Sequence, residues 1–368
     1  MANLNIRTPR FYVDYINFMN IRDRFGAHYG IHTANLGGQQ IAISSGSVAE
    51  LYDMRPLNQV EFDTTQNSGQ DHVNLWIDLK TSNFKVDFVA ILNHNMHRAD
   101  AKVRISASNT FDEVKTVDHV GADDTEGNMT LTKIIGVADN TETGTQQAGI
   151  SNNKATSDDA SSWGTGHTIV TFPESTNRYW GIQFEGTNSQ TSLGDNDGTF
   201  DGTNKLKIGC ILLGQYYDLP RSPDLSVKRS IEFDGVSMQE SIGGQRFSNI
   251  RQFGRKTLAD DNKSPFLTYF NSFGAYGGRM SYDMKFSYLN STDIMPNNYN
   301  EFQNSDEGII EDLWNKTNGR HTPFIFTQDK SSSDYSDYLF ARFAQDSLSM
   351  TQVAPDVFDI SMKIEEEF

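Results

Sequence analysis

Cysteine is nearly absent from this chain of 368 residues, because Cys210 is the only one. A single cysteine excludes an internal disulfide and fits synthesis in a reducing compartment. Long apolar runs are absent too: residues 88–92 and 210–213 are the longest, and a membrane-spanning helix needs roughly 20 such residues. Residues 1–7 contain no apolar stretch, so we expect no secretory signal. We therefore expect neither a disulfide-stapled secreted domain nor a membrane protein.

Positive charge is scarce. The sequence has 31 Lys and Arg against 48 Asp and Glu, which gives a formal net charge of −17. Affinity for phosphate comes mostly from Lys and Arg. The balance therefore argues against sequence-specific or coating nucleic-acid binding and against adsorption to an anionic membrane.

Catalytic motifs are also missing. The sequence contains no phosphate-binding loop, no Gly-x-Gly-x-x-Gly before a helix and no Gly-x-Ser-x-Gly elbow. His94 and His97 lack the further ligands that a metal site needs, so we interpret them as part of a polar turn between strands. Cys210 falls on an apolar strand face, where a thiol is inert packing. We expect no enzyme activity, no cofactor and no metal.

What is abundant points to β-structure. The chain has 29 Gly, 24 Phe and 14 Tyr, a composition that suits short aromatic-rich strands joined by turns. Period-2 alternation predicts antiparallel strands, with residues 206, 208, 210 and 212 sharing one face and Met280 to Tyr288 giving the clearest apolar alternation. Residues 86–92 are almost continuously apolar, as in a strand buried on both faces. The predicted strands are 72–80, 86–92, 103–107, 168–172, 178–184, 205–213, 227–233, 280–288, 323–327, 338–344 and 358–364.

Two prolines divide the sequence into two predicted domains. Pro220 and Pro223 mark a boundary between domains at 1–220 and 221–368. In the second domain we predict one short helix over 306–318, with Ser305 as N-cap, Gly319 as C-terminal stop and an apolar stripe between them. The stripe is Ile309, Ile310, Leu313 and Trp314.

Two polar excursions interrupt the strands. Residues 109–166 form a polar insertion whose apolar island, 131–137, is interpreted as a hairpin of its own; the insertion is either a surface loop or a contact with a partner or host. Residues 235–278 contain a basic cluster in an acidic chain, either incidental charge on a solvated loop or a contact with an acidic neighbouring subunit. The candidate subunit-contact residues are Arg246, Arg251, Arg255 and Lys256.

Several stretches of the first domain occur in a familiar order. They are Trp76-Ile77-Asp78-Leu79, Ile91-Leu92-Asn93-His94-Asn95, Val103-Arg104-Ile105-Ser106-Ala107-Ser108, Arg178-Tyr179-Trp180-Gly181-Ile182 and Ile208-Gly209-Cys210-Ile211-Leu212-Leu213-Gly214. The order is similar to galactose-binding-like (discoidin-type) jelly rolls. The jelly-roll version with Asn-His-Asn after the buried strand, here Asn93-His94-Asn95, resembles modules of structural proteins of tailed bacteriophages. The opening at residues 8–15 also resembles the start of such phage proteins. The later order of strand, helix and strands, with its acidic end at 365–367, resembles the barrel of tail-tube and distal-tail proteins.

The resemblance implies an all-β chain, an N-terminal jelly-roll β-sandwich followed by a tail-tube-like β-barrel domain. It implies a structural virion protein of the tail or baseplate, made in the host cytoplasm, forming a ring with itself, a hexamer, beside other tail proteins. The alternative is a carbohydrate- or receptor-binding protein at the tail tip, with the insertion and the candidate exposed aromatic Trp163 contacting a host glycan. Trp180 is assigned to the core, no sugar-binding residues are carried over, and nothing positive supports a polysaccharide hydrolase.

Overall fold

The computed structural model describes residues 7–22, 31–33, 41–65, 72–96, 99, 101–111, 114, 131–135, 149–151, 166–186, 200–232, 236–250, 279–295, 308–332 and 337–367. Strands dominate these residues, and every strand pairing among them is antiparallel. The mostly-β class predicted from alternation is confirmed. No helix in the described part of the chain is long and apolar enough to cross a membrane.

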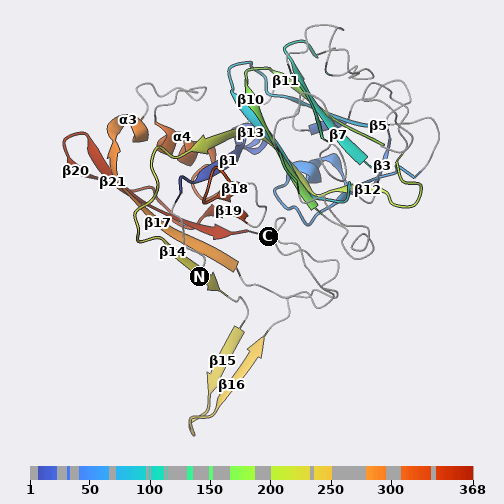
Figure 1. The fold of residues 1–368 in the computed structure, drawn as a ribbon. Helices are drawn as coiled ribbons and strands as arrows, with labels where there is room; N and C mark the ends of the chain where they lie inside the picture. Colours follow the sequence, from blue (N-terminus) through green and yellow to red (C-terminus); the bar gives the residue numbers. More distant parts are fainter. Residues whose placement is uncertain are drawn as a thin grey trace.

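The N-terminal half is built from two sheets that share one hydrophobic core (Figure 1). One is a five-stranded sheet, in spatial order β2 (Ile31–Thr33), β5 (His72–Asp78), β11 (Tyr179–Gly186), β7 (Ala101–Ser108) and β8 (Leu131–Ile135). The other side is part of an eleven-stranded sheet, with β13 (Cys210–Asp218), β6 (Val86–His94), β10 (Gly166–Ser175) and β9 (Gly149–Ser151). Ile77 and Ile105 from the first sheet join Val89 and Leu213 from the second in the core. Every residue of β6 is buried, which confirms the continuously apolar strand.

The same large sheet continues into the C-terminal half. Its order there is β14 (Lys228–Glu232), β17 (Arg279–Asn290), β21 (Val357–Glu366), β19 (Tyr338–Phe343), β18 (Phe324–Thr327) and then β1 (Arg10–Asp14), which pairs with β13. β20 (Met350–Ala354) pairs with β21 off this path. Helices α3 (Ser291–Ile294) and α4 (Ile309–Lys316) contribute Ile294, Ile310 and Leu313 to the second core. The described strands of this half form an open sheet and do not close into a barrel.

Strand β1 belongs to two cores at once, because successive side chains of a strand point to opposite faces. Phe11 packs in the C-terminal core, with its ring centroid 5.3 Å from that of Phe324. Tyr12 faces a third cluster that joins both halves, where its ring meets the ring of Phe88 edge-on at 5.1 Å. The N-terminal strand therefore ties the residues before the predicted 220/221 boundary to those after it.

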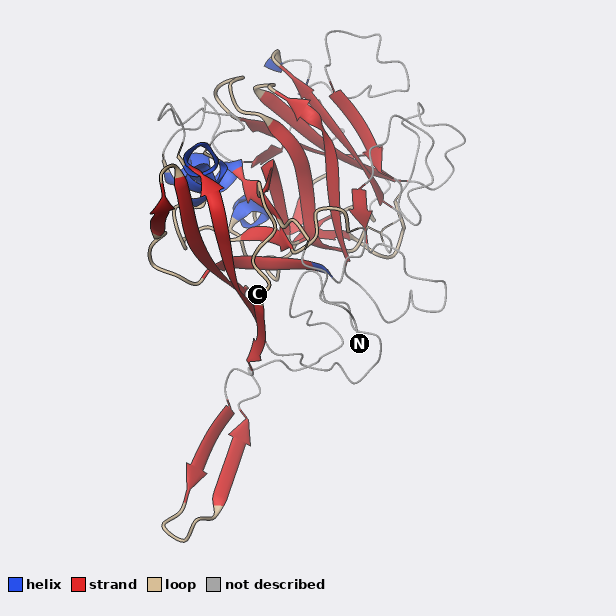
Figure 2. Cartoon of the chain, turned by 60° about the vertical axis from the view of Figure 1, so that its left-hand side comes forward, coloured by secondary structure: helices blue, strands red, loops and turns tan. Residues whose placement is uncertain are grey.

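The remaining described elements are small. A three-stranded sheet contains β3 (Ile43–Ser45), β4 (Val60–Phe62) and β12 (Leu206–Ile208), with the 3-10 helix η1 (Val48–Tyr52) beside it in sequence. Strands β15 (Val236–Glu240) and β16 (Arg246–Ile250) form a separate hairpin that projects from the body in Figures 1 and 2.

The strand predicted over 205–213 is broken, which corrects the prediction. It forms β12 and β13, separated by Gly209, whose N–H donates to the Leu92 carbonyl oxygen. A Cβ atom on Gly209 would lie 2.0 Å from the carbonyl oxygen of Pro56, so only glycine fits this close approach. Beyond the break, Cys210 leaves the face shared by Leu206 and Ile208 and joins the third cluster.

The prediction of one helix is wrong in number and partly in position. The predicted helix is present as α4, but it begins at Ile309 with Gly308 as N-cap in a left-handed conformation; residues 305–307 lie outside the described residues. The helix ends at Lys316 with Thr317 as C-cap, and Asn318 at φ 50° is already left-handed, so it stops before the predicted Gly319, which is left-handed too at φ 64°. Helix α1 (Tyr15–Ile21) was not predicted, because its buried residues, Tyr15, Ile16, Phe18 and Met19, leave no clear polar face.

Within the island 131–137, residues 131–135 form β8, which extends the five-stranded sheet by pairing with β7; the rest of the predicted hairpin lies outside the described residues. One local expectation fails. Tyr288 does not share the buried face of β17: a register shift between Phe286 and Leu289 and a φ of 59° at Tyr288 turn it outward, and Leu289 is buried in its place.

Candidate functional site

The most exposed element is the β15–β16 hairpin, residues 236–250, named here the arm. Its turn uses Gly244 at φ 80°, whose N–H donates to the Ser241 carbonyl oxygen. Every residue from 237 to 249 is exposed, and in Figures 1 and 2 the arm extends away from both cores. An isolated two-stranded hairpin is at best marginally stable in water, so an arm of this kind gains stability when another surface covers it.

The arm exposes apolar side chains on all its sides. Met238 and Phe247 are 64% and 54% exposed, and Ile242 in the turn is fully exposed. Because Met238 pairs with Ser248, and Gln239 with Phe247, Met238 and Phe247 lie on opposite faces. Contact with one flat surface would cover only one of these faces.

The predicted basic cluster falls only partly within the described residues. Arg246 begins β16, is exposed, and forms an ion pair with Glu240 across the hairpin at 3.3 Å. Arg251, Arg255 and Lys256 lie outside the described residues, as does Trp163. The Arg246 charge is therefore balanced within the arm, and the apolar residues, which the charge pattern did not indicate, are what the arm presents.

Three further apolar residues, Leu225, Tyr288 and Val353, are 93%, 69% and 51% exposed. The Ser287 hydroxyl donates to Asp224 Oδ2 at 2.7 Å, which holds residue 225 beside the end of β17. Gln352 of β20 pairs with Phe358, which in turn pairs with Leu289 of β17. These three residues come from separate segments of the chain, and their exposure has no local signal in the sequence.

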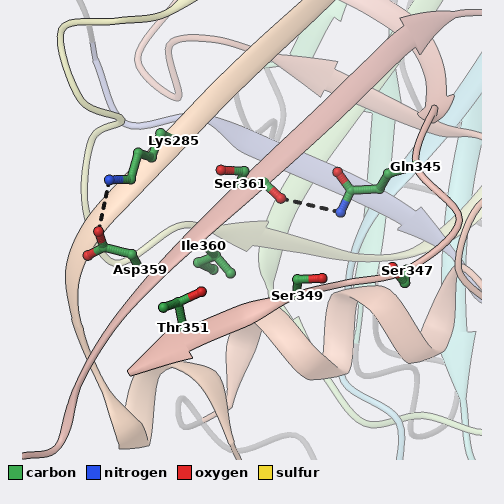
Figure 3. A pocket seen from close by; sticks show the side chains of 8 residues that line it. All are labelled: Lys285, Gln345, Ser347, Ser349, Thr351, Asp359, Ile360 and Ser361. Carbon is green, nitrogen blue, oxygen red and sulfur yellow. Dashed lines mark hydrogen bonds and ion pairs between the residues drawn. The ribbon is translucent and has the colours of Figure 1, made fainter. Parts of the chain in front are cut away.

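An open groove of about 400 Å³ lies on the polar face of the same sheet (Figure 3). Its lining is Lys285, Gln345, Ser347, Ser349, Thr351, Asp359, Ile360 and Ser361. Lys285 and Asp359 are joined by an ion pair of 2.9 Å, which raises the pKa of Lys285 and lowers that of Asp359. The groove thus offers hydroxyl groups beside a balanced pair of charges.

Gln345 closes the gap where β21 passes from β20 to β19. Its Nε2 donates to the Ser361 carbonyl oxygen at 3.3 Å, and its Oε1 accepts from the Lys363 N–H at 2.8 Å. The side-chain amide takes the place of a neighbouring strand at this point. The Ser361 carbonyl oxygen and the Lys363 N–H at the groove therefore have hydrogen-bond partners.

A buried polar cluster joins α4 to the N-terminal half. The Lys316 ammonium donates to the hydroxyls of Tyr15 and Tyr217 at 3.1 and 2.9 Å and pairs with Asp312 at 2.9 Å. Burial lowers the pKa of Lys316, against the effect of Asp312, and raises the pKa of both tyrosines well above the usual value. Three acceptors match the three N–H groups of an ammonium, so the cluster serves as a joint between the halves.

The Asn93-His94-Asn95 motif is structural as well. Asn93 Nδ2 donates to the Pro56 carbonyl oxygen at 2.7 Å, and Asn95 Oδ1 accepts from the Lys207 N–H at 2.6 Å. His94 is fully buried, with Nε2 2.9 Å from the Thr168 hydroxyl and Nδ1 accepting from the Met96 N–H. Burial lowers the pKa of His94 to about 3. Together these side chains fasten the end of β6 to its surroundings.

In the described part of the chain, no cluster of three or more His, Cys, Asp or Glu residues is suited to hold a metal ion. Cys210 is buried, and burial raises the pKa of its thiol well above the usual value. A scan against protein-family models finds no family that matches this chain, and a search of curated proteins finds no match either. Within the described residues, the arm and the groove offer exposed side chains for binding.

Proposed function

We propose that this chain is a structural virion protein of a tailed bacteriophage, a tail or baseplate component that forms a ring with copies of itself. The observation that carries the proposal is the arm, a projecting hairpin with exposed apolar residues on both faces and at its turn. An element of this kind is expected in a subunit whose neighbours cover the exposed apolar side chains. The ring is a hexamer, flanked by other tail proteins, and the chain is made in the host cytoplasm before it enters the virion.

The same proposal assigns a finer fold. The two-sheet N-terminal half is a galactose-binding-like jelly roll, and the C-terminal half, with α4 against its sheet, is related to the tube-type domains of tails. The support is the order of the strands and the packing of α4 against the sheet of the C-terminal half. A net charge of −17 also suits a tail through which DNA slides without sticking.

The test is the protein content of purified particles of the virus that encodes the chain. We expect the chain in the tail fraction, in a copy number that is a multiple of the ring number, and antibody labelling on the tail by electron microscopy. Absence from the particles, or labelling confined to the head, would overturn the proposal.

The groove favours a second candidate function, recognition of a host carbohydrate at the tail tip. Hydroxyl groups that both donate and accept, such as those of Ser349 and Thr351, suit sugar hydroxyls. Binding on a glycan array that is lost in Ser349→Ala and Thr351→Ala, but kept in Ser45→Ala, would support it. An array without binding would exclude the groove as a glycan site.

A further inference from the structure

We propose that Tyr288 is the stacking platform of a carbohydrate site at the groove, and that this site takes an uncharged sugar ring. The inference deepens the second candidate function, recognition of a host carbohydrate, and rests on it. It adds an aromatic residue that is not part of the groove lining, and it names the chemical class of the sugar.

The bulge in β17 places Tyr288 at the edge of the groove. The register shift after Phe286 leaves two residues, Ser287 and Tyr288, opposite the single residue Asp359 of β21. The Tyr288 N–H donates to Asp359 Oδ1 at 3.3 Å, and Asp359 lines the groove. The hydrogen bond and charge of Asp359 are the main causes of the raised pKa of Lys285, and Tyr288 adds a smaller one. Tyr288 therefore adjoins the charged pair of the groove.

The backbone of Tyr288 has a conformation that the core does not explain. Its φ of 59° lies in the left-handed region, which residues other than glycine rarely adopt. The side chain is 69% exposed, so burial does not offset this strain. Strained residues cluster at binding sites, and bulges redirect side chains beside such sites. The consequence of the bulge is an aromatic ring that is presented to solvent next to the groove.

One row of residues crosses three strands at this point. Asp359 lies opposite Tyr288 on one side and pairs with Thr351 of β20 on the other. Neighbouring strands are about 4.8 Å apart, so the row spans roughly 10 Å, enough for one or two sugar rings. Lys285 pairs with Ser361 in the next row, and its ammonium lies 2.9 Å from Asp359 (Figure 3). An aromatic ring, a carboxylate and a hydroxyl thus lie in sequence along one edge of the groove.

These groups match the two kinds of surface on a sugar. The faces of a sugar ring carry C–H groups, which pack on the partly negative face of an aromatic ring such as that of Tyr288. Lys285, Ser287 and Tyr288 already contact the Asp359 carboxylate. Because a carboxylate has about four lone-pair positions, one remains for a sugar hydroxyl. The Lys285 ammonium has further N–H groups, and the Thr351 hydroxyl both donates and accepts.

The charges favour an uncharged sugar over an acidic one. The Lys285 ammonium is paired with Asp359, so an acidic group on the sugar would compete with that carboxylate. Asp224, which accepts from the Ser287 hydroxyl at 2.7 Å, adds negative charge beside the same row. The net charge of −17 repels anions from the whole molecule.

The experiment places the full chain on an array of neutral glycans, built from hexoses, N-acetylhexosamines and deoxyhexoses, beside acidic glycans that contain sialic or uronic acids. The strongest neutral binder is then titrated in solution at low and high salt. We expect binding to neutral glycans, with a Kd that changes little with salt, because an uncharged sugar gains no attraction that salt can screen. A preference for acidic glycans would overturn the inference.

Two substitutions separate the ring from its hydroxyl. Tyr288→Asn removes the ring but suits the left-handed backbone, because asparagine adopts a positive φ more readily, so thermal melting should match that of wild type. We expect it to raise the Kd by about tenfold through loss of the stacking contact. Tyr288→Phe keeps the ring, and its Kd should stay within about threefold of the wild-type value. The control is Leu57→Ala, which shortens an exposed apolar side chain outside the groove and should bind as wild type does.

This inference and the candidate function fail in different ways. An array without binding removes both. Binding that is lost in Ser349→Ala and Thr351→Ala but kept in Tyr288→Asn leaves the groove as a glycan site and overturns the role of Tyr288. Equal loss in Tyr288→Phe and Tyr288→Asn would also overturn stacking, because the ring would then be insufficient.

Discussion

The Lys316 ammonium of α4 lies 2.9 Å from the Tyr217 hydroxyl of β13, and that hydroxyl donates to Asp312 at 2.6 Å. The contact joins the C-terminal helix to the sheet shared by both halves. Lys316 and Tyr15 are almost fully buried, and the Lys316 ammonium also lies 4.9 Å from the Tyr15 ring centroid. A charge in this position stabilises the fold only while its acceptors remain in place.

Lys316→Met should lower the free energy of unfolding by about 3 kcal/mol, because it leaves Asp312 and the tyrosine hydroxyls without their cation. Urea unfolding measures this change. The double variant Asp312→Leu/Lys316→Met should recover much of the loss, since no unpaired charge remains. Equal losses in the single and double variants would contradict the account.

Sequence patterns identified the elements whose signal is local. The continuous apolar run of β6 and the alternation of Ile360, Met362 and Ile364 in β21 are both confirmed. Sequence patterns failed where contacts between distant segments determine the local structure. At Gly209, where the strand is interrupted, only glycine fits beside Pro56, which is distant in sequence. The bulge in β17 exposes Tyr288 without changing the apolar pattern.

The candidate site was less predictable than the fold. Charge drew attention to Arg246, but its partner Glu240 is six residues away on the same hairpin, and the pairing neutralises it. Leu225, Tyr288 and Val353 are exposed on three separate segments. Exposure of an apolar residue in a strand of alternating pattern is a property of the folded chain, so the sequence alone does not show it.

Asp14→Ala should destabilise the protein by about 2 kcal/mol or more. The Asp14 carboxylate caps α1 by accepting from the N–H groups of Ile16 and Asn17, and it also accepts from the Leu213 N–H. Loss of the side chain leaves these donors unsatisfied in a buried place. Thermal unfolding is the measurement. Ser47→Ala is the control: Ser47 is the N-cap of η1 but makes no capping bond, so its change should stay below about 0.5 kcal/mol.

Gly214→Ala should disrupt the pairing of β1 with β13. A Cβ atom at Gly214 would lie 1.9 Å from the Val13 carbonyl oxygen, so the two backbones must separate. Overpacking of this kind costs about 1–3 kcal/mol, and we expect the upper end, measured by urea unfolding. Gly202→Ala is the matched control, because no atom lies within 4 Å of its added Cβ. Equal stability of the two variants would refute the close approach.

His94 should make stability depend on pH. Its pKa is about 3 in the folded protein and about 6.5 when unfolded. Between these values the unfolded chain binds more protons, so stability falls as pH decreases from 6.5, by up to about 1.4 kcal/mol per pH unit. His94→Asn removes this contribution while keeping an oxygen that can accept from the Met96 N–H. The difference in unfolding free energy between wild type and variant should therefore shrink steadily as pH falls from 6.5 to 4. Asp14, whose pKa burial raises to about 6, acts in the opposite direction but is present in both chains, so its contribution cancels. A difference that stays constant over this range would mean that His94 takes up a proton in the folded state.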